Sequence, residues 1–171
     1  GSLIPRKNVS RLLQAFDKFK TFTKTTAKLL IVGSPMFKTG DMKRKYAEMR
    51  HKNDIVFTGR LNPADLRDVL GSALALTFVP YFEGFGIPVL EAMYCDVPVI
   101  TSNVTSMPEV AGDAALLVNP FSVDAIAEAM KTMHDNSDVR KKLIEKGRIR
   151  RQRFSWDKTA EKLWTSIESV M

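Results

Sequence analysis

The apolar positions of the chain follow two spacings that alternate along its length. Five short runs are rich in aliphatic and β-branched residues, and each is too short for a helix and too apolar for a half-exposed strand. We predict that these runs are strands buried on both faces of a parallel sheet. They are Lys28–Val32, Ile55–Thr58, Leu74–Val79, Val97–Thr101 and Ala115–Val118.

Helical spacing fills the intervals between these runs. The clearest case begins at Val9, where apolar residues recur three and four positions apart up to Phe19. Further helices are predicted around Met42–Met49, after a cap at Asn62, over Pro88–Tyr94, and from a cap at Ser122 to Met133. The alternation predicts a doubly wound, Rossmann-like α/β domain with helices on both faces of its sheet. Two successive helices, Ser137–Arg153 and Trp156–Val170, end the chain without a strand between them, and Ser155 is the predicted cap of the second.

Length and composition exclude a disordered chain, a collagen and a disulfide scaffold. A chain of 171 residues matches one domain, and 44% hydrophobic with 26% charged residues is a globular composition. A single cysteine, Cys95, forms no internal disulfide and suits a reducing compartment. No apolar run approaches the ~18 residues of a membrane span, and no signal peptide is visible. His51 and His134 have no cysteine or histidine cluster beside them, which argues against a metal site.

The net charge of +7 is unevenly distributed. Residues 1–52 hold 13 basic and 3 acidic side chains, residues 53–130 hold 2 and 10, and residues 131–171 hold 11 and 6. A basic chain suggests nucleic acid, acidic lipid or phosphorylated small molecules as partners. The basic run over residues 140–153 is read first as a solvated helix face, and second as a contact with an anionic membrane surface.

The loop after Leu74–Val79 is the strongest candidate for a ligand site, because parallel α/β sheets bind ligands beyond the carboxyl ends of their strands. Gly84 and Gly86 allow the backbone to approach a ligand closely, and a helix begins directly after them. The N–H groups of that helix favour an anion, most naturally a phosphate. Glu83 and Glu91 flank the same point and can accept hydrogen bonds from hydroxyls or stabilise positive charge.

A second candidate lies ahead of the first helix. Arg6 and Lys7 stand at a helix start, where cations oppose the helix dipole, so a bound anion would explain their position. Taken alone, this segment is also well described as a solvated turn with Asn8 as the helix cap.

Taken together, these segments resemble a known family. The chain is similar to the C-terminal, donor-binding half of a retaining GT-B glycosyltransferase of family 4, also called group 1. The similarity covers about residues 3–120. It rests on Pro5-Arg6-Lys7-Asn8 with Leu12-Leu13 and Ala15-Phe16, on Leu29–Gly33, on Val56–Gly59, on the E-x7-E segment Glu83–Glu91, on Pro98–Ser102 and on Pro108–Ala115.

The resemblance implies a nucleotide-sugar donor and a role for each site residue. Lys7, with Arg6, would contact the donor diphosphate, and Glu91 would bind the ribose. Glu83 would contact the donor sugar and is the candidate catalytic residue, without being assigned as a nucleophile. The backbone of the loop and helix start would hold the diphosphate, and the turn after the second predicted strand would lie beside the base. These two segments are Gly84, Phe85, Gly86 and Ile87, and Gly59, Arg60, Leu61 and Leu66.

The resemblance also implies an activity and a place for it. The full-length enzyme would move a hexose from GDP-mannose or a UDP-sugar to a glycan or lipid-linked acceptor, as in surface or capsular polysaccharide synthesis. No cofactor or essential metal is expected. The enzyme would be cytoplasmic, with a peripheral position on the inner face of the membrane as an alternative.

The expected organisation is half of a two-domain enzyme. Residues 1–171 would form a single nucleotide-sugar-binding domain, with a βα core over residues 1–135 and C-terminal helices over residues 136–171. The N-terminal GT-B domain would be absent and the opening strand missing or cut short, so this chain alone would bind donor weakly and transfer no sugar. Two alternatives stay open: a basic nucleic-acid-binding module without enzymatic activity, and a GT-B sugar-nucleotide epimerase or phosphorylase.

Overall fold

A computed structural model describes residues 2–35 and 40–170, and it contains all five predicted strands. Their ends lie within two residues of the predicted ones. Two very short strands, β1 and β3, add to them, and every pairing is parallel. Ladders join β1 to β3, β2 to β4, and β5 to β6 to β7. The strands are β1 (Ser2–Leu3), β2 (Leu29–Val32), β3 (Ser34–Pro35), β4 (Ile55–Gly59), β5 (Leu76–Phe78), β6 (Val99–Ser102) and β7 (Ala115–Val118).

The helices form where helical spacing and caps predict them, with one addition, α5. The side chains of Asn62, Ser122 and Ser155 each accept a hydrogen bond from a backbone N–H three residues on, as N-caps do. The α-helices are α1 (Val9–Thr23), α2 (Gly40–Glu48), α3 (Pro63–Gly71), α4 (Ile87–Tyr94), α5 (Met107–Ala111), α6 (Val123–Asp135), α7 (Ser137–Arg151) and α8 (Trp156–Glu168). Two short 3₁₀ helices are η1 (Pro5–Lys7) and η2 (Lys52–Asp54).

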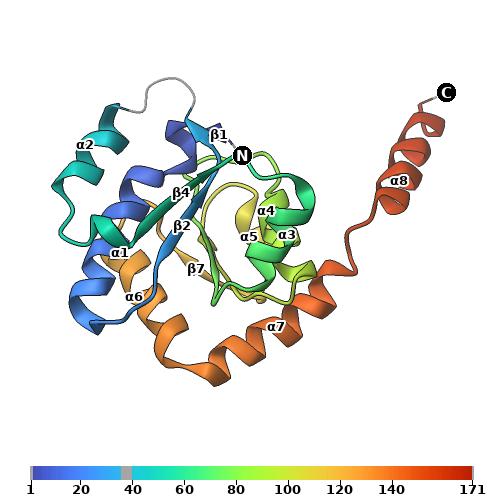
Figure 1. The fold of residues 1–171 in the computed structure, drawn as a ribbon. Helices are drawn as coiled ribbons and strands as arrows, with labels where there is room; N and C mark the ends of the chain where they lie inside the picture. The colour runs from blue at the N-terminus through green and yellow to red at the C-terminus, as the bar shows by residue number, and fades with distance from the viewer. Residues whose placement is uncertain (1, 36–39, 171) are drawn as a thin grey trace.

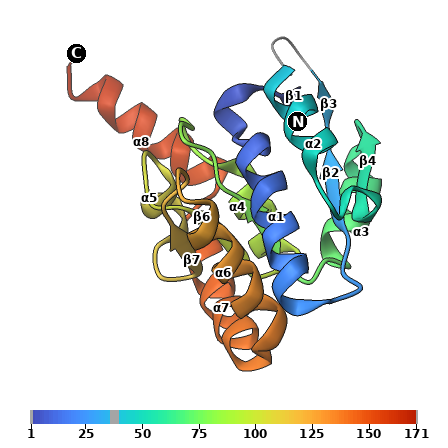
Figure 2. The ribbon, with the colours of Figure 1, turned by 90° about the vertical axis from the view of Figure 1, so that its left-hand side faces the viewer.

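Helices cover both faces of the sheet, so the predicted fold class is confirmed (Figures 1 and 2). One core cluster joins α1 and α6 to the sheet, and the other joins α4 and α5 to its opposite side. Strand β6 shows how the faces divide, because Ile100 points into the first cluster and its neighbour Val99 into the second. All four residues of β6 are buried, as predicted for a central strand.

The prediction that every strand is buried on both faces holds fully only for β6 among the described strands; it fails at Leu117 of β7 and, most clearly, for β2 and β4. Leu30 of β2 and Val56 and Phe57 of β4 are each about two-fifths exposed, at 44%, 38% and 42%. Strand β4 pairs only with β2 among the described strands, and the other edge of β2 faces a cavity. These two strands therefore lie at the border of the sheet, where sequence hydrophobicity does not guarantee burial.

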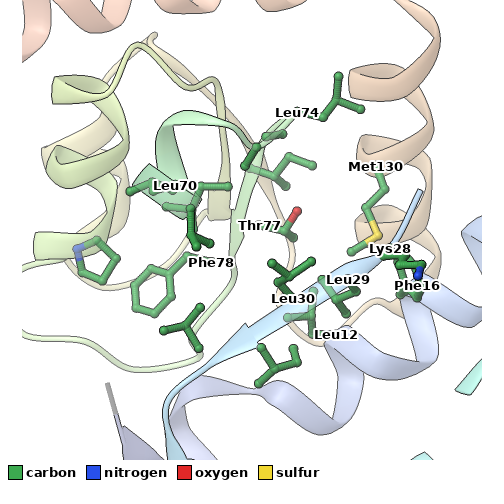
Figure 3. Close-up of a pocket in the computed structure, with 18 of the residues that line it drawn as sticks. Leu12, Phe16, Lys28, Leu29, Leu30, Leu70, Leu74, Thr77, Phe78 and Met130 are labelled. Carbon is green, nitrogen blue, oxygen red and sulfur yellow. The ribbon is translucent and has the colours of Figure 1, made fainter. Parts of the chain in front are cut away.

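An apolar cavity of about 570 Å³ separates β2 from β5 (Figure 3). Leu29 and Leu30 line it from β2, Thr77 and Phe78 line it from β5, and α1, α3 and α6 close it with apolar side chains. No ladder joins the two strands within residues 2–35 and 40–170. Most of its lining is aliphatic and aromatic, but three of the predicted donor-binding residues, Lys7, Leu66 and Glu91, line it as well.

Helix α7 uses its basic residues to dock on the domain, so the interpretation of this run as a solvated face is wrong for four of them. Arg148 makes two hydrogen bonds to Asp96, at 3.0 and 2.8 Å, and Arg151 reaches the same carboxylate at 3.2 Å. Arg150 donates to the Val110 carbonyl, and Lys146 pairs with Asp113 at 2.7 Å. The ends of α4 and α5 present carbonyl oxygens and acidic residues there, which attract cations.

Helix α8 extends away from the domain (Figure 1). Its apolar face is exposed, with Trp156 85%, Leu163 62% and Trp164 61% exposed. None of the described residues of α8 is buried. The amphipathic pattern alone could not show this, because it identifies a face that suits burial without showing what covers it.

Removing α8 is therefore expected to leave the domain as stable as before. Deletion of residues 155–171 should change the unfolding free energy by less than about 0.5 kcal/mol, because no buried contact is lost. The matched control deletes residues 137–171 and also removes α7, whose Leu143 is buried, and should cost about 3 kcal/mol or more. Both are measured by urea unfolding followed by circular dichroism, since both tryptophans lie in α8. A large loss in the shorter deletion would contradict the exposed position of α8.

Candidate functional site

The two candidate segments found in the sequence lie against each other. Arg6 donates to the carboxylate of Glu83 at 2.7 Å, and Lys7 pairs with the same Oε2 atom at 3.1 Å. The backbone joins the segments as well, because the N–H of Tyr81 donates to the carbonyl of Arg6 at 3.1 Å. The turn before α1 and the loop between β5 and α4 thus form one cluster of charged groups beyond the carboxyl end of β5.

Asn8 holds this arrangement together, in a role that differs from the predicted one. It has φ 62°, in the left-handed region that Asn tolerates better than most residues, and its side chain makes no capping hydrogen bond to α1. Its buried amide instead donates to the carbonyls of Val79, at 2.9 Å, and Pro120, at 2.7 Å. One side chain therefore joins the end of η1 to the segments that follow β5 and β7. The segment is not the solvated turn that the sequence suggested.

The carboxylate of Glu83 is held ionised by its neighbours. Partial burial raises the pKa of Glu83, but hydrogen bonds and charge from Arg6 and Lys7 outweigh burial and lower it below the ordinary 4.5. The ionised form therefore stabilises the folded domain above the ordinary pKa, and this contribution is lost as the pH falls through the lower folded-state pKa. The backbone of Glu83 is held separately, because its carbonyl accepts a hydrogen bond from the Ser106 hydroxyl at 2.8 Å.

Gly86 allows the loop to enter α4 beside this cluster. Its φ is +114°, and a Cβ at this position would overlap Cε of Met107. Ile87 then begins α4 at the positive end of its dipole; Pro88 carries no N–H, and the N–H of Val89 donates to the carbonyl of Gly86 at 2.9 Å. Gly84 is exposed with open space around it, and Phe85 contacts Phe154 edge to face. The strict requirement for glycine therefore falls on Gly86.

The remaining predicted residues divide into two groups. Glu91 is exposed on α4, and it lines the same cavity as Lys7 and Leu66. Gly59 ends β4 with φ +71° and accepts a hydrogen bond from Gly33, while the next two residues are exposed or half-buried. Across residues 2–35 and 40–170, no described hydrogen bond or ion pair joins Gly59, Arg60 or Leu61 to the Glu83 cluster.

Two contributors were not predicted from the sequence: Asn8 as a tether and Ser106 as the partner of the Glu83 backbone. An asparagine between a 3₁₀ turn and an α-helix is a signal for the left-handed backbone, but its side-chain partners are more than 70 positions away. Only the fold brings those partners together.

The described part of the chain shows no metal site and no spanning helix. No group of three or more His, Cys, Asp or Glu side chains gathers there as metal ligands would. None of its helices combines the length and the apolarity needed to cross a bilayer.

The fold and the order of the elements define the class of protein first: this is the C-terminal half of a GT-B fold. The chain belongs to the family described as glycosyl transferases group 1, whose family model matches residues 1–150. The O-antigen chain mannosyltransferase B of Escherichia coli is 35% identical over 158 residues, covering 92% of this chain and 41% of the relative. The chain therefore spans less than half the length of that relative.

Solved structures agree on the fold. The Anabaena protein HepE, in complex with UDP and glucose, superposes with a TM-score of 0.85 at 19% identity, covering 99% of this chain and 46% of HepE. The C-terminal domain of a glycosyl transferase group 1 family protein from Francisella tularensis has a TM-score of 0.76 at 21% identity, covering 88% of this chain and 80% of that domain.

Proposed function

We propose that this domain binds the nucleotide-sugar donor of a retaining hexosyltransferase. The observation that carries the proposal is the convergence of Arg6 and Lys7 on the loop that leads into α4. Two cations and the N-terminus of a helix suit a diphosphate, and the carboxylates of Glu83 and Glu91 suit the hydroxyls of a sugar and a ribose. An α/β sheet with its ligand beyond the strand ends is the usual place for such a site.

The roles of the individual residues are those that the family resemblance implies. Lys7 and Arg6 neutralise the diphosphate, aided by the N–H groups near Gly86 and Ile87. Glu83 contacts the hexose, Glu91 the ribose, and Leu66 lies on the side of the base. The mannosyltransferase relative and the neighbour bound to UDP and glucose support a hexose donor of the GDP-mannose or UDP-sugar type.

The proposed reaction transfers the hexose with retained configuration. The bond between the anomeric carbon and the diphosphate oxygen breaks, and a bond from the acceptor hydroxyl oxygen to that carbon forms on the same face. The acceptor proton goes to an oxygen of the departing diphosphate. Arg6, Lys7 and the α4 N-terminus stabilise the charge that develops on this leaving group. The acceptor, a glycan or lipid-linked saccharide, is bound by the rest of the longer enzyme.

Donor binding tests this proposal directly. Titration calorimetry at low salt with UDP-, GDP- and ADP-hexoses is expected to show millimolar or tighter binding of at least one. Lys7→Ala should weaken that binding about tenfold, because it removes a charge-assisted contact to phosphate. Lys43→Ala is the matched control: it removes the same charge from an exposed position of α2 and should change binding less than twofold. Equal effects of the two variants would contradict the proposed site.

A further inference from the structure

We propose that Glu83 is a specificity-determining residue whose carboxylate competes with the donor diphosphate for Arg6 and Lys7. In the free domain its carboxylate occupies the point on which Arg6 and Lys7 converge, and a ligand that also offers sugar hydroxyls draws it away. This inference rests on the proposed function and extends it. The inference predicts that the site discriminates against diphosphates that carry no hexose.

The geometry of the cluster supports the competition. Both cations reach the same oxygen atom, Oε2 of Glu83, rather than one oxygen each. Lys7 is further held by the ring of Phe78, with its ammonium 4.8 Å from the ring centre, and Arg6 also donates to the carbonyl of Phe82 at 3.3 Å. The two positive groups are therefore aimed at one anionic oxygen. A phosphate oxygen has the charge and acceptor capacity to take that place.

The carboxylate can leave this position without disturbing the backbone. Glu83 lies in the loop between β5 and α4, and the Ser106 hydroxyl holds its carbonyl at 2.8 Å independently of the side chain. Its side chain is 15% exposed and that of Arg6 39%, so the pair borders solvent and is not enclosed in the core. A change of rotamer then carries the carboxylate from the cations to a neighbouring hydroxyl group.

The competition has opposite consequences for substrate and product. An intact donor supplies phosphate oxygens to the cations and hydroxyls to Glu83, so every charged group keeps a partner. A nucleoside diphosphate or pyrophosphate supplies phosphate oxygens but no hexose hydroxyls for Glu83. It must displace Glu83 and leaves that carboxylate beside an anion without a compensating donor. Glu83 thereby weakens retention of the product after transfer.

Inorganic pyrophosphate is the probe that isolates this effect, because it has neither ribose nor hexose. Calorimetry at fixed pH and ionic strength should show that Glu83→Gln raises pyrophosphate affinity about threefold to tenfold, since the competing charge is gone. Glu109→Gln controls for general electrostatics. It removes a negative charge from an exposed position on α5, the helix whose Met107 contacts the loop glycine, and should change affinity less than twofold.

The donor then provides the second readout. Affinities are measured for the nucleotide sugar that binds and for its own nucleoside diphosphate. The ratio of the first affinity to the second should be lower in Glu83→Gln than in the wild type, by at least the factor by which pyrophosphate affinity rises. Thermal melts confirm that each variant is folded, and Glu83→Ala replaces the Gln variant if that one does not fold. A loss or no change in pyrophosphate affinity on removing the carboxylate, or an equal gain in Glu109→Gln, overturns the inference.

The two proposals fail in different ways. If Lys7→Ala abolishes pyrophosphate binding while Glu83→Gln leaves it unchanged, the anion site exists and the competition does not. If neither pyrophosphate nor any nucleotide sugar binds the wild-type domain or the variants, the proposed function fails and the competition with it.

Discussion

Replacement of Asn8 by Ala is expected to lower the unfolding free energy by about 3 kcal/mol. The variant loses the buried amide that donates to the carbonyls of Val79 and Pro120, and both acceptors are left unsatisfied. Alanine must also adopt φ 62°, which costs about 1–2 kcal/mol for a residue with a Cβ. Chemical denaturation followed by circular dichroism measures the loss. Donor affinity should fall as well, because Asn8 follows Arg6 and Lys7 directly.

Two further variants at this position separate the causes. Asn8→Gly removes the hydrogen bonds without the backbone strain, so it should lose less stability than Asn8→Ala by about 1 kcal/mol. Asn8→Asp keeps the shape but directs carboxylate oxygens at two carbonyls, and should lose at least as much as the alanine variant. If Asn8→Ala unfolds within about 0.5 kcal/mol of the wild type, the tether is not a stabilising contact.

Replacement of Gly86 by Ala is expected to be the most damaging single methyl addition in the loop. The residue stands at φ +114°, which strains any residue with a Cβ, and the new Cβ would overlap the terminal methyl group of Met107, so that side chain must move. We expect a loss of about 2 kcal/mol of unfolding free energy from strain and overpacking together. We also expect at least a tenfold loss of diphosphate binding, because the start of α4 shifts.

Gly84→Ala is the matched control for this effect. It adds the same methyl group two residues earlier, where nothing lies within 4 Å of the new Cβ and the backbone conformation is ordinary. Its stability should stay within about 0.5 kcal/mol of the wild type. Similar losses in the two variants would show that the loop tolerates neither methyl group. The prediction that Gly86 requires glycine more strictly than Gly84 would then be wrong.

Local patterns predicted the secondary structure well because its causes are local. Each predicted strand is present, and the Asn62, Ser122 and Ser155 caps make the expected hydrogen bonds. Helical caps and periodic apolar positions act over three to eight residues, so a short window contains the information. The family could be recognised for a similar reason, since its segments recur in a fixed order along one chain.

The candidate site was predicted in its parts but not in its contacts. The sequence singled out Arg6 and Lys7 as one possible anion site and Glu83 as part of another, and the resemblance assigned them to one donor. It did not show that the three side chains pair with one another in the free domain. Their pairing depends on how β5 is placed beside η1. These two elements are far apart along the chain, so a local sequence pattern carries no information about their contact.

The amino-acid sequence by itself determined the strands, the helices, the family and the residues that carry charge at the site. The tertiary structure alone decided that Asn8 is a buried tether, that α7 docks through Asp96, and that α8 is exposed. The physical reason is the range of the interactions. Propensity and capping act between neighbours, whereas burial, ion pairing and the direction of a buried amide depend on which distant segments the fold places together.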